Sequence, residues 1–574
     1  MTEFRIRLSD RDENGDITLF LKDILEKCRS TEGEKLVSFE KGEYHFYAEH
    51  CNKKIMYASN TDSHRFPEKL IAVDIDGQKN LIFDGNGSDF ILHGKVVPFS
   101  VTNSERIFLR GFSWDFPAAG TLECEVVSSS YLHTDFRINK GIDWEIEGRK
   151  LLWFEKSPLT GERYWENNGQ SKSHCVVCHD RERKNVARRP LTKGPFWGVR
   201  KITSRGDNII RVHYLLPHTD RKGLIYEMCP NYNRDSVGSF FCDSKDITVE
   251  NVKVHYMHGF GWLTQMCENV SYINCSFTPK NGSDRYCTSF ADLIHVSGAK
   301  GKIHIEGCSF SNAHDDPINI HGTYTQVTEK IGERTLRLEY KHNQQRGFTQ
   351  YHKGDKVVFY LRKDFSSLMN EAEFTVESVV NPLCDGNSDQ EMLVTFVEKL
   401  PDELSQKDEY VCENVTYTPE VYIGSCHFSL IPTRGILCTT RRKTVIEKNT
   451  FDGMTMASIY ISNDCNDWYE SGPVRDMTIR DNDFYITDAV SGMHPAIFID
   501  PIVHGENSGE TSIHSGITIE NNRIYLKAGQ KAIVGKYCKN LRVAGNTVYG
   551  SDGTSPYIVE DCSEAVFEGN KEFE

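Results

Sequence analysis

A short pattern recurs along the second half of the chain and strongly limits the folds open to it. Two apolar residues at alternate positions are followed, three positions on, usually by Cys or Asn, and then by another apolar residue. The first copy has Val in place of the Cys or Asn. The copies are Ile247, Val249, Val252, Val254; Val270, Tyr272, Cys275, Phe277; Ile303, Ile305, Cys308, Phe310; Val421, Ile423, Cys426, Phe428; Met477, Ile479, Asn482, Phe484; Ile517, Ile519, Asn522, Ile524; and Leu541, Val543, Asn546, Val548.

The spacing of the copies indicates a solenoid. Neighbouring copies begin at positions 247 and 270, and again at positions 517 and 541. This nearly constant interval is typical of one coil of a parallel β-helix rather than of a hairpin. Alternate residues of a strand point inward, and identical residues stack at the bends of successive coils. We therefore predict an all-β, right-handed parallel β-helix in which Cys275, Cys308 and Cys426 are structural.

Interruptions of the pattern predict the domain organisation. Ile17 to Cys28 has the apolar spacing of a helix that would cover the open end of the solenoid, and Leu81–Phe83 and Ile107–Trp114 look like first rungs. Two long stretches carry alternating strands separated by turns and predict inserted antiparallel, barrel-like β domains. The predicted parts are 1–122 (cap and first rungs), 123–240 (first insertion), 241–323 (rungs with the active site), 324–415 (second insertion) and 416–574 (C-terminal rungs).

Charge and hydrophobicity exclude several classes of protein. The 574 residues include 67 basic and 82 acidic side chains, a formal net charge of -15, which repels phosphate backbones and argues against nucleic-acid binding. No apolar run is long enough to span a bilayer. The first residues, 1–16, are polar and lack the apolar core of a secretion signal. The protein is therefore either intracellular or numbered after a removed signal.

The densest group of titratable residues follows the rung at 303–310. Asp315 and Asp316 lie between His314 and His321, and Pro317 restricts Asp316 to an extended backbone. An isolated pair of aspartates usually caps a turn or is solvated. Here a third carboxyl group weakens that interpretation, because Asp292 precedes Asp315 by one coil, the same interval that separates the copies at 247 and 270.

Residues one coil apart stack at roughly 4.8 Å, so the three aspartates are predicted to converge. A glycosidase needs one carboxylic acid to protonate the leaving oxygen and a second carboxylate as base or nucleophile. Side chains that diverge from adjacent rungs would leave room for a water, as an inverting enzyme requires. We therefore predict a glycosidase with Asp292, Asp315 and Asp316 as catalytic residues and inversion as the outcome.

Further polar and aromatic residues near these aspartates are candidates for sugar binding. Each is individually more often structural, since an aromatic ring that suits a sugar face also fills a groove. The candidates are Trp262, His295, His314, Asn319, His321 and Arg434.

A possible metal motif is discounted. Cys175-Val-Val-Cys178-His179, preceded by His174, matches the spacing of haem attachment and resembles part of a zinc cluster. No second pair of cysteines follows at zinc-ribbon spacing, and the motif lies in a basic stretch of the first insertion. We expect no metal or other cofactor, and an exposed cysteine pair that can form a disulfide.

With these residues in view, the chain resembles glycoside hydrolase family 110, bacterial exo-α-1,3-galactosidases that act on blood group B type structures. The resemblance covers most of the chain and rests on the run from His314 to Tyr324, the preceding Ala-Asp-Leu-Ile-His at 291–295, and a β-helix with two interrupting β domains. It implies an inverting, metal-independent enzyme with Asp292 as general acid and Asp315 or Asp316 as base. It also implies a periplasmic or secreted protein whose signal is absent from this sequence.

Two other functions stay open from the sequence. One is another β-helix polysaccharide hydrolase, or a lyase, which would be expected to place basic residues, often with calcium, around the acids. The other is a non-enzymatic, glycan-binding β-helix such as a tailspike or adhesin. In each case the expected partner is a glycan, without nucleic acid or a membrane span. The oligomeric state, including a homodimer, is open.

Overall fold

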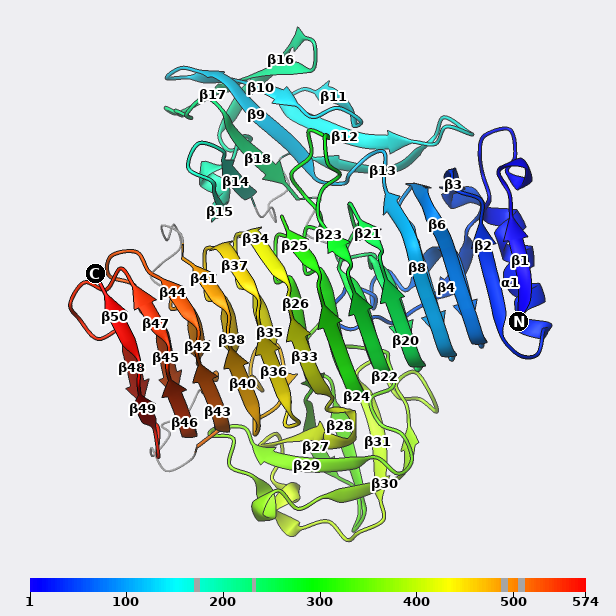
Figure 1. Ribbon diagram of the computed structural model, residues 1–574. Coiled ribbons are helices and arrows are strands. Elements are labelled where there is room, and N and C mark those ends of the chain that lie inside the picture. Colours follow the sequence, from blue (N-terminus) through cyan, green and yellow to red (C-terminus); the bar gives the residue numbers. More distant parts are fainter. Residues whose placement is uncertain (170–175, 230–233, 487–493, 504–511) are drawn as a thin grey trace.

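The chain folds into an elongated β-helix with one domain on each flank (Figure 1). The computed structural model describes residues 1–169, 176–229, 234–486, 494–503 and 512–574. Within these ranges, 34 strands join into one sheet that is paired almost entirely in parallel. The N- and C-termini lie at opposite ends of the solenoid. The predicted parallel β-helix with inserted antiparallel β domains is thus confirmed.

A short helix closes the N-terminal end, as its apolar spacing predicts. Helix α1 (Thr18–Ser30) buries Leu21, Ile24, Leu25 and Cys28 against the first coils. Strand β1 (Thr2–Ile6) pairs in parallel with β2 (Lys35–Phe39) beside it. The cap removes the apolar end of the core from water.

The predicted first rungs are also confirmed. Strand β2 pairs with β6 (Lys79–His93), β6 with β8 (Glu105–Asp115), and β8 with β20 (Lys245–Glu250). The last pairing sets Ile107 beside Ile247, although the whole first insertion separates them in the sequence. The first insertion therefore leaves the solenoid after β8, and the chain returns to the next coil in register.

Each later coil contributes strands to three parallel rows. The first row is β22 (Trp262–Ile273), β24 (Ile294–Glu306), β33 (Glu420–Gly424), β36 (Thr444–Glu447), β40 (Met477–Arg480), β43 (His514–Glu520) and β46 (Cys538–Ala544). The second is β23 (Ser276–Phe277), β25 (Ser309–Ser311), β34 (His427–Ile431), β37 (Thr450–Met454), β41 (Asp483–Tyr485), β44 (Arg523–Tyr525) and β47 (Thr547–Tyr549). The third is β26 (Ile318–Thr323), β35 (Ile436–Cys438), β38 (Ile459–Ile461), β42 (Ile497–Ile499), β45 (Ile533–Lys536) and β48 (Tyr557–Glu560).

The bend between the first two rows explains the recurring Cys or Asn. The backbone N–H of Cys275 lies 3.4 Å from the sulfur of Cys308 one coil on. Further along, asparagines form a ladder in which each side-chain amide donates to the oxygen of the next at 3.0 Å; its members are the buried Asn449, Asn482, Asn522 and Asn546 and the half-buried Asn570. These bonds satisfy polar groups inside the core, so the predicted stacking at the bends is confirmed.

One rung escapes the sequence pattern. Strands β36 and β37 form a coil around Ile446, Asn449 and Phe451, between the copies that begin at Val421 and Met477. Thr444 occupies the first inward position of this coil and is fully buried. A polar residue at that position breaks the apolar alternation on which the prediction depends.

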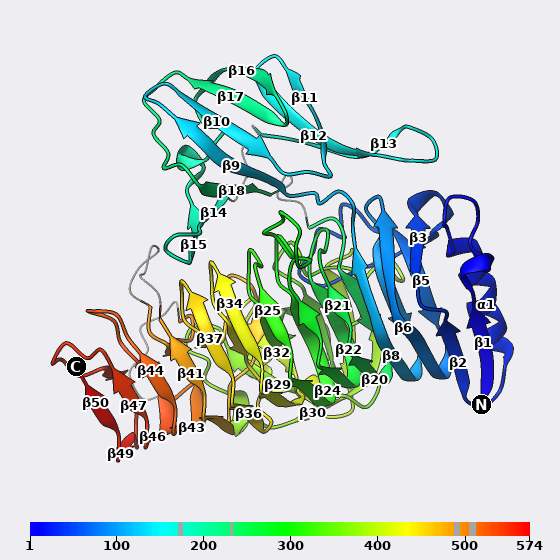
Figure 2. The ribbon, with the colours of Figure 1, turned by 45° about the horizontal axis from the view of Figure 1, so that its top comes forward.

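The first insertion forms two antiparallel sheets beside the solenoid. The larger sheet has the order β15 (Asn185–Arg189), β14 (Val176–Asp180), β18 (Leu224–Met228), β9 (Leu122–Ser129), β10 (His133–Ile138), β17 (Ile209–Tyr214), β16 (Val199–Gly206). The smaller sheet joins β11 (Asp143–Glu147), β12 (Lys150–Lys156) and β13 (Arg163–Asn168). Figure 2 shows this domain above the coils, with β15 nearest to β34.

The second insertion is a closed barrel on the opposite flank (Figure 1). Its strand order is β27 (Thr325–Lys330), β28 (Thr335–Glu339), β31 (Glu391–Phe396), β30 (Phe374–Val380), β29 (Lys356–Leu361), β32 (Tyr410–Asn414). The strands expected at 336–340, 356–361 and 392–396 correspond to β28, β29 and β31. Alternate residues of these strands fill the barrel core.

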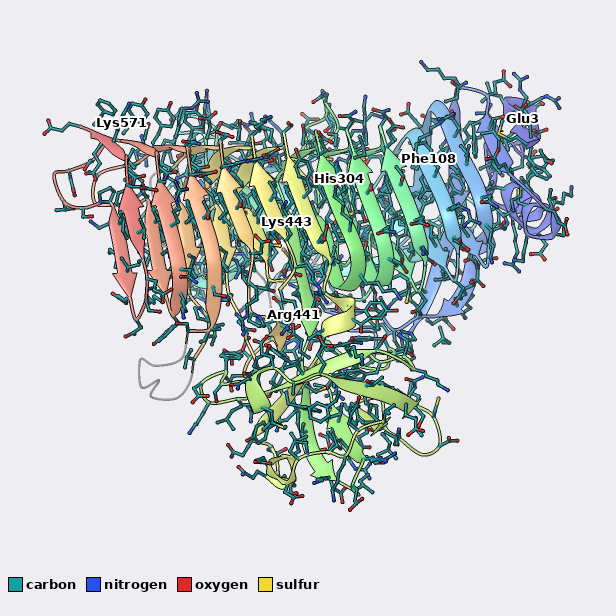
Figure 3. The ribbon with its side chains drawn as sticks, turned by 60° about the horizontal axis from the view of Figure 1, so that its bottom comes forward. Glu3, Phe108, His304, Arg441, Lys443 and Lys571 are labelled. Carbon is teal, nitrogen blue, oxygen red and sulfur yellow. The ribbon has the colours of Figure 1, made fainter. Side chains whose placement is uncertain are left out.

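A buried ion pair joins this barrel to the solenoid. Figure 3 shows Arg441 at the junction of the two, whereas Lys443 lies on the solenoid. The Arg441 guanidinium donates to Glu413 on β32 at 2.9 Å, and it also contacts Glu371 at 3.2 Å and the hydroxyl of Tyr360. The side chain of Glu413 is only 1% exposed, so Arg441 supplies the counter-charge that its burial requires.

We therefore predict that Arg441→Gln lowers the free energy of unfolding by about 3 kcal/mol, because it leaves the Glu413 carboxylate buried without its partner. The matched control is Lys443→Gln, two positions on, whose side chain is exposed. Denaturant unfolding followed by circular dichroism compares the two variants. Equal midpoints for both would contradict the role given to Arg441.

Candidate active site

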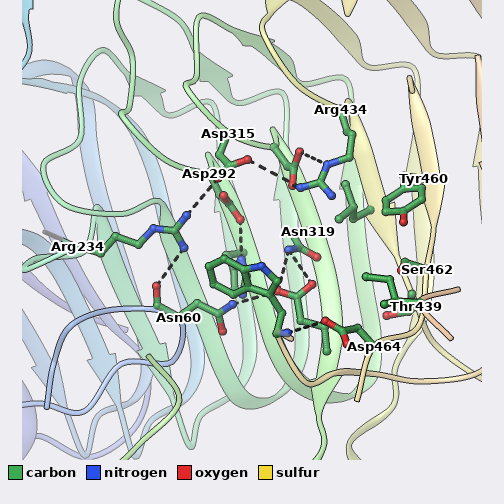
Figure 4. Close-up of a pocket in the computed structure, with 16 residues that line it drawn as sticks. Asn60, Arg234, Asp292, Asp315, Asn319, Arg434, Thr439, Tyr460, Ser462 and Asp464 are labelled. Carbon is green, nitrogen blue, oxygen red and sulfur yellow. Dashed lines mark hydrogen bonds and ion pairs between the residues drawn. The ribbon is translucent and has the colours of Figure 1, made fainter. Parts of the chain in front are cut away.

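A polar pocket opens beside the coils that carry β24 and β26 (Figure 4). Residues from several successive coils and from two loops outside the rungs contribute to it. The lining residues are Asn60, Arg234, Asp292, His295, Asp315, Asp316, Asn319, Arg434, Leu437, Thr439, Tyr460, Ser462, Asp464, Trp468, Glu470 and Ile502.

The three aspartates named from the sequence lie in this pocket together. One oxygen from each of Asp292, Asp315 and Asp316 lies within 4.8 Å of the others. Three of the candidate sugar-binding residues, His295, Asn319 and Arg434, line the same pocket. Residues that are far apart in the sequence therefore share one centre.

Three other candidates do not line the pocket, and their proposed contact with sugar is corrected. Trp262 is fully buried in the solenoid core, where its ring lies 5.0 Å from that of Trp114. His314 points under the first insertion and contacts the carboxylate of Glu227. His321 is 1% exposed and lies behind His295. Inward and outward positions alternate along a strand, and these side chains take the inward or covered ones.

The register between coils differs by one residue from the expected one. Ile294 pairs with Ile318, and Ser289 bridges to Ala313, so the same alignment holds on both sides of the aspartates. Asp292 therefore lies level with Asp316, rather than with Asp315. The backbone N–H of Leu293 donates to the carbonyl of Asp316 at 3.1 Å, which fixes this alignment.

The separation of the carboxyl groups bears on the stereochemical outcome expected of a glycosidase. Inverting glycosidases usually hold their two carboxyl groups roughly 6.5 to 9.5 Å apart, and retaining ones about 5 to 5.5 Å. Here the nearest oxygens lie within 4.8 Å of one another. This distance between the nearest oxygens does not decide between the two classes, so inversion stays a prediction.

Three guanidinium groups surround the aspartates. Arg434 donates to both oxygens of Asp316, at 3.0 and 2.8 Å, in a two-pronged ion pair. Asp315 lies between Arg234, at 3.1 Å, and Arg188, at 3.3 Å. Arg188 belongs to β15 of the first insertion, so that domain reaches the catalytic coil.

These contacts separate the protonation of the aspartates. Burial, aided by the charge of Asp315, raises the pKa of Asp292 to about 8. Burial also acts to raise the pKa of Asp315, but the charges of Arg188, Arg234 and Arg434 outweigh it and bring that pKa below its ordinary value. At neutral pH the free site therefore holds a protonated Asp292 beside an ionised Asp315.

The pKa of Asp316 is raised as far as that of Asp292, so the contacts of the two side chains decide between them. Burial and the neighbouring carboxylates raise its pKa to about 8, while Arg434 opposes the shift. Its two-pronged bond to Arg434 favours the charged form, whereas the partner of Asp292 is His295, at 2.7 Å, whose own pKa burial lowers well below its usual value. We therefore place the proton on Asp292.

Several pocket residues are not signalled by the sequence pattern. Asp464 accepts the backbone N–H groups of Asn466 and Asp467, at 2.8 and 2.9 Å, and so shapes the loop that presents Trp468. Trp468 is 38% exposed and places an aromatic ring in the pocket lining. From the sequence, Trp468 could have been found only as an aromatic residue that is followed by an acid, Glu470, in a loop between rungs.

Among the described residues, the aspartates of the pocket form one group that could hold a metal ion. The oxygens of Asp292, Asp315 and Asp316 are close enough to hold a cation. However, Arg188, Arg234 and Arg434 already balance their charge and would repel a divalent ion. In the Cys-Val-Val-Cys-His motif, His174 and Cys175 lie outside the described residues. The expectation of an exposed cysteine pair is wrong for Cys178, which is buried on β14, and His179 bonds to Glu227 at 2.7 Å.

Two family models match parts of the chain. Residues 335–409 match the family model described as GLAA-B beta-barrel domain II, and residues 434–571 match a right handed beta helix region. Among solved structures, a tailspike protein mutant of an E. coli bacteriophage, in complex with a pentasaccharide, has a TM-score of 0.41 at 9% identity, over 98% of this chain and 66% of its own. No helix in the described part of the chain is long and apolar enough to cross a membrane.

A β-helix with three converging carboxyl groups in a polar pocket has the architecture of a β-helix glycoside hydrolase. Alpha-1,3-galactosidase A of Streptomyces avermitilis is 34% identical over 94% of this chain and 87% of its own length. The enzyme of the same name from Bacteroides thetaiotaomicron is 33% identical over 95% and 93%. Alpha-1,3-galactosidase B of Phocaeicola vulgatus is 30% identical over 92% and 87%. The chain belongs to this family of glycoside hydrolases, which excludes a solely glycan-binding β-helix.

The raised pKa of Asp292 has a consequence for stability. A carboxyl group whose pKa is higher in the folded than in the unfolded protein makes stability fall as pH rises towards the folded value. Asparagine does not ionise, so we predict that Asp292→Asn is more stable than the wild type by about 1 to 3 kcal/mol at pH 7.5, and that the gain shrinks towards pH 4.5.

Thermal unfolding across this pH range tests the prediction, with the exposed Asp481→Asn as matched control. A gain that does not change with pH, or a loss of stability at pH 7.5, would contradict the protonated state assigned to Asp292.

Proposed function

We propose that this protein is an exo-acting α-1,3-galactosidase of glycoside hydrolase family 110. It removes terminal α-1,3-linked galactose from branched glycans of the blood group B type and from linear Gal-α-1,3-Gal. One observation carries the proposal: three carboxyl groups with different protonation meet in a pocket of a chain whose relatives are named α-1,3-galactosidases. A pocket, rather than a long cleft, suits removal of a terminal sugar.

Each aspartate has a proposed role. Asp292, protonated at neutral pH, donates its proton to the glycosidic oxygen as the galactose leaves. Asp315, kept ionised by its arginines, accepts a proton from the attacking water. Asp316 is held by Arg434 next to both and supports the positive charge that develops on the galactosyl ring. Asn319 and Trp468 are proposed to contact the sugar.

We also propose inversion of configuration at the anomeric carbon. A retaining enzyme needs a carboxylate oxygen that is free to bond the anomeric carbon. Both oxygens of Asp316 are engaged by Arg434, and those of Asp315 contact Arg234 and Arg188. Such oxygens are poor nucleophiles but can still orient and deprotonate a water.

The three proposed roles predict different losses of activity in the three Asn variants. With Gal-α-1,3-Gal, each of Asp292→Asn, Asp315→Asn and Asp316→Asn is expected to lower kcat/KM by about 10³-fold or more. With an aryl α-galactoside, whose leaving group needs no proton, Asp292→Asn is expected to regain much of that loss and Asp315→Asn none of it.

Release of galactose from the linear disaccharide and from the branched B trisaccharide is measured beside Asp481→Asn as control. Recovery in Asp315→Asn instead would exchange the roles of acid and base. Activity that survives in all three variants would end the catalytic assignment. An unsaturated product absorbing in the ultraviolet would indicate a lyase.

The stereochemical outcome is a separate prediction. Proton NMR of a fresh reaction is expected to show β-galactose first, because the water attacks the face opposite to the leaving group. The α anomer should then appear only at the rate of mutarotation. If α-galactose forms first, a covalent intermediate is required and the role of Asp315 changes to nucleophile.

The cellular location stays a prediction. A periplasmic or secreted enzyme is expected from the family resemblance, and expression with fractionation of the native host tests it.

A further inference from the structure

A chain of hydrogen bonds runs from Asp292 into the interior, away from the pocket. Asp292 Oδ2 lies 2.7 Å from His295 Nδ1, His295 Nε2 lies 2.9 Å from His321 Nε2, and His321 Nδ1 lies 2.6 Å from the carbonyl oxygen of Gly322. The side chains of both histidines are 1% exposed and that of Asp292 is 4% exposed. The chain of bonds is therefore shielded from bulk water.

The inner end of this chain of hydrogen bonds determines which nitrogen of each histidine ring carries hydrogen. A carbonyl oxygen only accepts, so His321 carries hydrogen on Nδ1. In a neutral ring the other nitrogen, Nε2, is then an acceptor, and His295 donates to it from its own Nε2. His295 Nδ1 is in turn an acceptor. Asp292 satisfies it only as a carboxylic acid that donates its O–H.

Two competing arrangements hold the same number of protons and leave Asp292 ionised. In one, His295 carries hydrogen on both nitrogens and donates to Asp292 and to His321. In the other, His321 carries the positive charge, its Nε2–H donates to His295, and His295 Nδ1–H donates to Asp292. Glu470, whose Oε1 lies 3.4 Å from His321 Nε2, favours both charged states, whereas the ionised Asp315 near Asp292 favours the neutral one.

The other groups around the two histidines also favour either the charged or the neutral arrangement. Arg234 and Arg434 act on Asp292 in favour of its ionised form. The ring of Phe260 lies 4.9 Å from that of His295 and offers it no polar partner. Burial disfavours an added charge on the pair, and burial is the largest influence on both Asp292 and His295.

We propose that His295 and His321 are positioning residues that hold the catalytic proton on Asp292, through a fixed pair of tautomers anchored at the carbonyl of Gly322. This inference rests on the proposed function only for the use of that proton. It gives the two histidines a role other than the sugar contact expected from the sequence, and it gives the general acid a second source of its protonation besides burial.

The tautomers can be measured without substrate. The protein is labelled with ¹⁵N-histidine, and the signals of the two rings are identified by their loss in His295→Asn and His321→Leu. The expected spectrum at pH 7 shows His295 with hydrogen on Nε2 only and His321 with hydrogen on Nδ1 only. A doubly protonated His321, or hydrogen on Nδ1 of His295, would overturn the proposal.

The pH dependence of kcat/KM supplies a second readout. His321→Leu removes the acceptor for His295, so that His295 turns its hydrogen to Nδ1 and stabilises the Asp292 carboxylate. We expect the alkaline limb of the kcat/KM profile to shift to lower pH by about one unit or more. Activity at low pH should stay within about tenfold of that of the wild type. His321→Gln, which offers an amide oxygen in place of Nε2, should restore the limb.

The control is His304→Leu on the outer face of β24, where His304 stacks on Tyr422. An equal loss at every pH in His321→Leu and His321→Gln would show a merely structural role. The two proposals fail separately, since a wild type that releases no galactose refutes the function while leaving the tautomers to be read.

Discussion

Parallel pairing between successive coils is the constraint on which the site depends. Each rung lies in register with the next, so residues one coil apart on β24 and β26 are spatial neighbours. This register sets Asp292 level with Asp316 and His295 beside Asn319. The ladders of Cys and Asn at the bends hold the register, because a shift by one residue would turn every inward side chain outward.

The register also brings together carboxyl groups whose like charges would destabilise the fold without nearby positive charges. Three carboxyl groups lie within 4.8 Å of each other, and two of them are nearly buried. Arg434 comes from the solenoid, Arg234 precedes β19 (Ser239–Cys242), and Arg188 comes from the first insertion. The inserted domain therefore contributes to the electrostatics of the site. The arginines keep Asp315 ionised, and burial together with the histidine pair leaves the proton on Asp292.

Much of this architecture could be predicted from the sequence, because a solenoid repeats one local rule. The period predicted the rungs, and the distance of one coil joined Asp292 to the Asp315–Asp316 pair. The rule failed at two local exceptions. The polar Thr444 breaks the apolar pattern of one rung, so the sequence did not predict that rung. A coil one residue longer than the expected interval aligns Asp292 with Asp316 instead of Asp315. The prediction for Trp262 was wrong because the apolar pattern does not distinguish a core ring from a pocket ring.

Other features had no signal in the sequence. Arg188 and Arg234 reach Asp315 from outside the rungs that carry the aspartates, so their contact depends on how an insertion docks. The hydrogen-bond chain beyond His295 depends on ring orientation, which no spacing encodes.

A crystal structure of Asp292→Asn with the intact B trisaccharide tests the central claim most directly. The account predicts the terminal galactose in the pocket, with its glycosidic oxygen about 3 Å from the residue 292 amide and a water between Asp315 and the anomeric carbon. A trisaccharide bound elsewhere on the solenoid, or a glycosidic oxygen that contacts only Asp315 or Asp316, would contradict it.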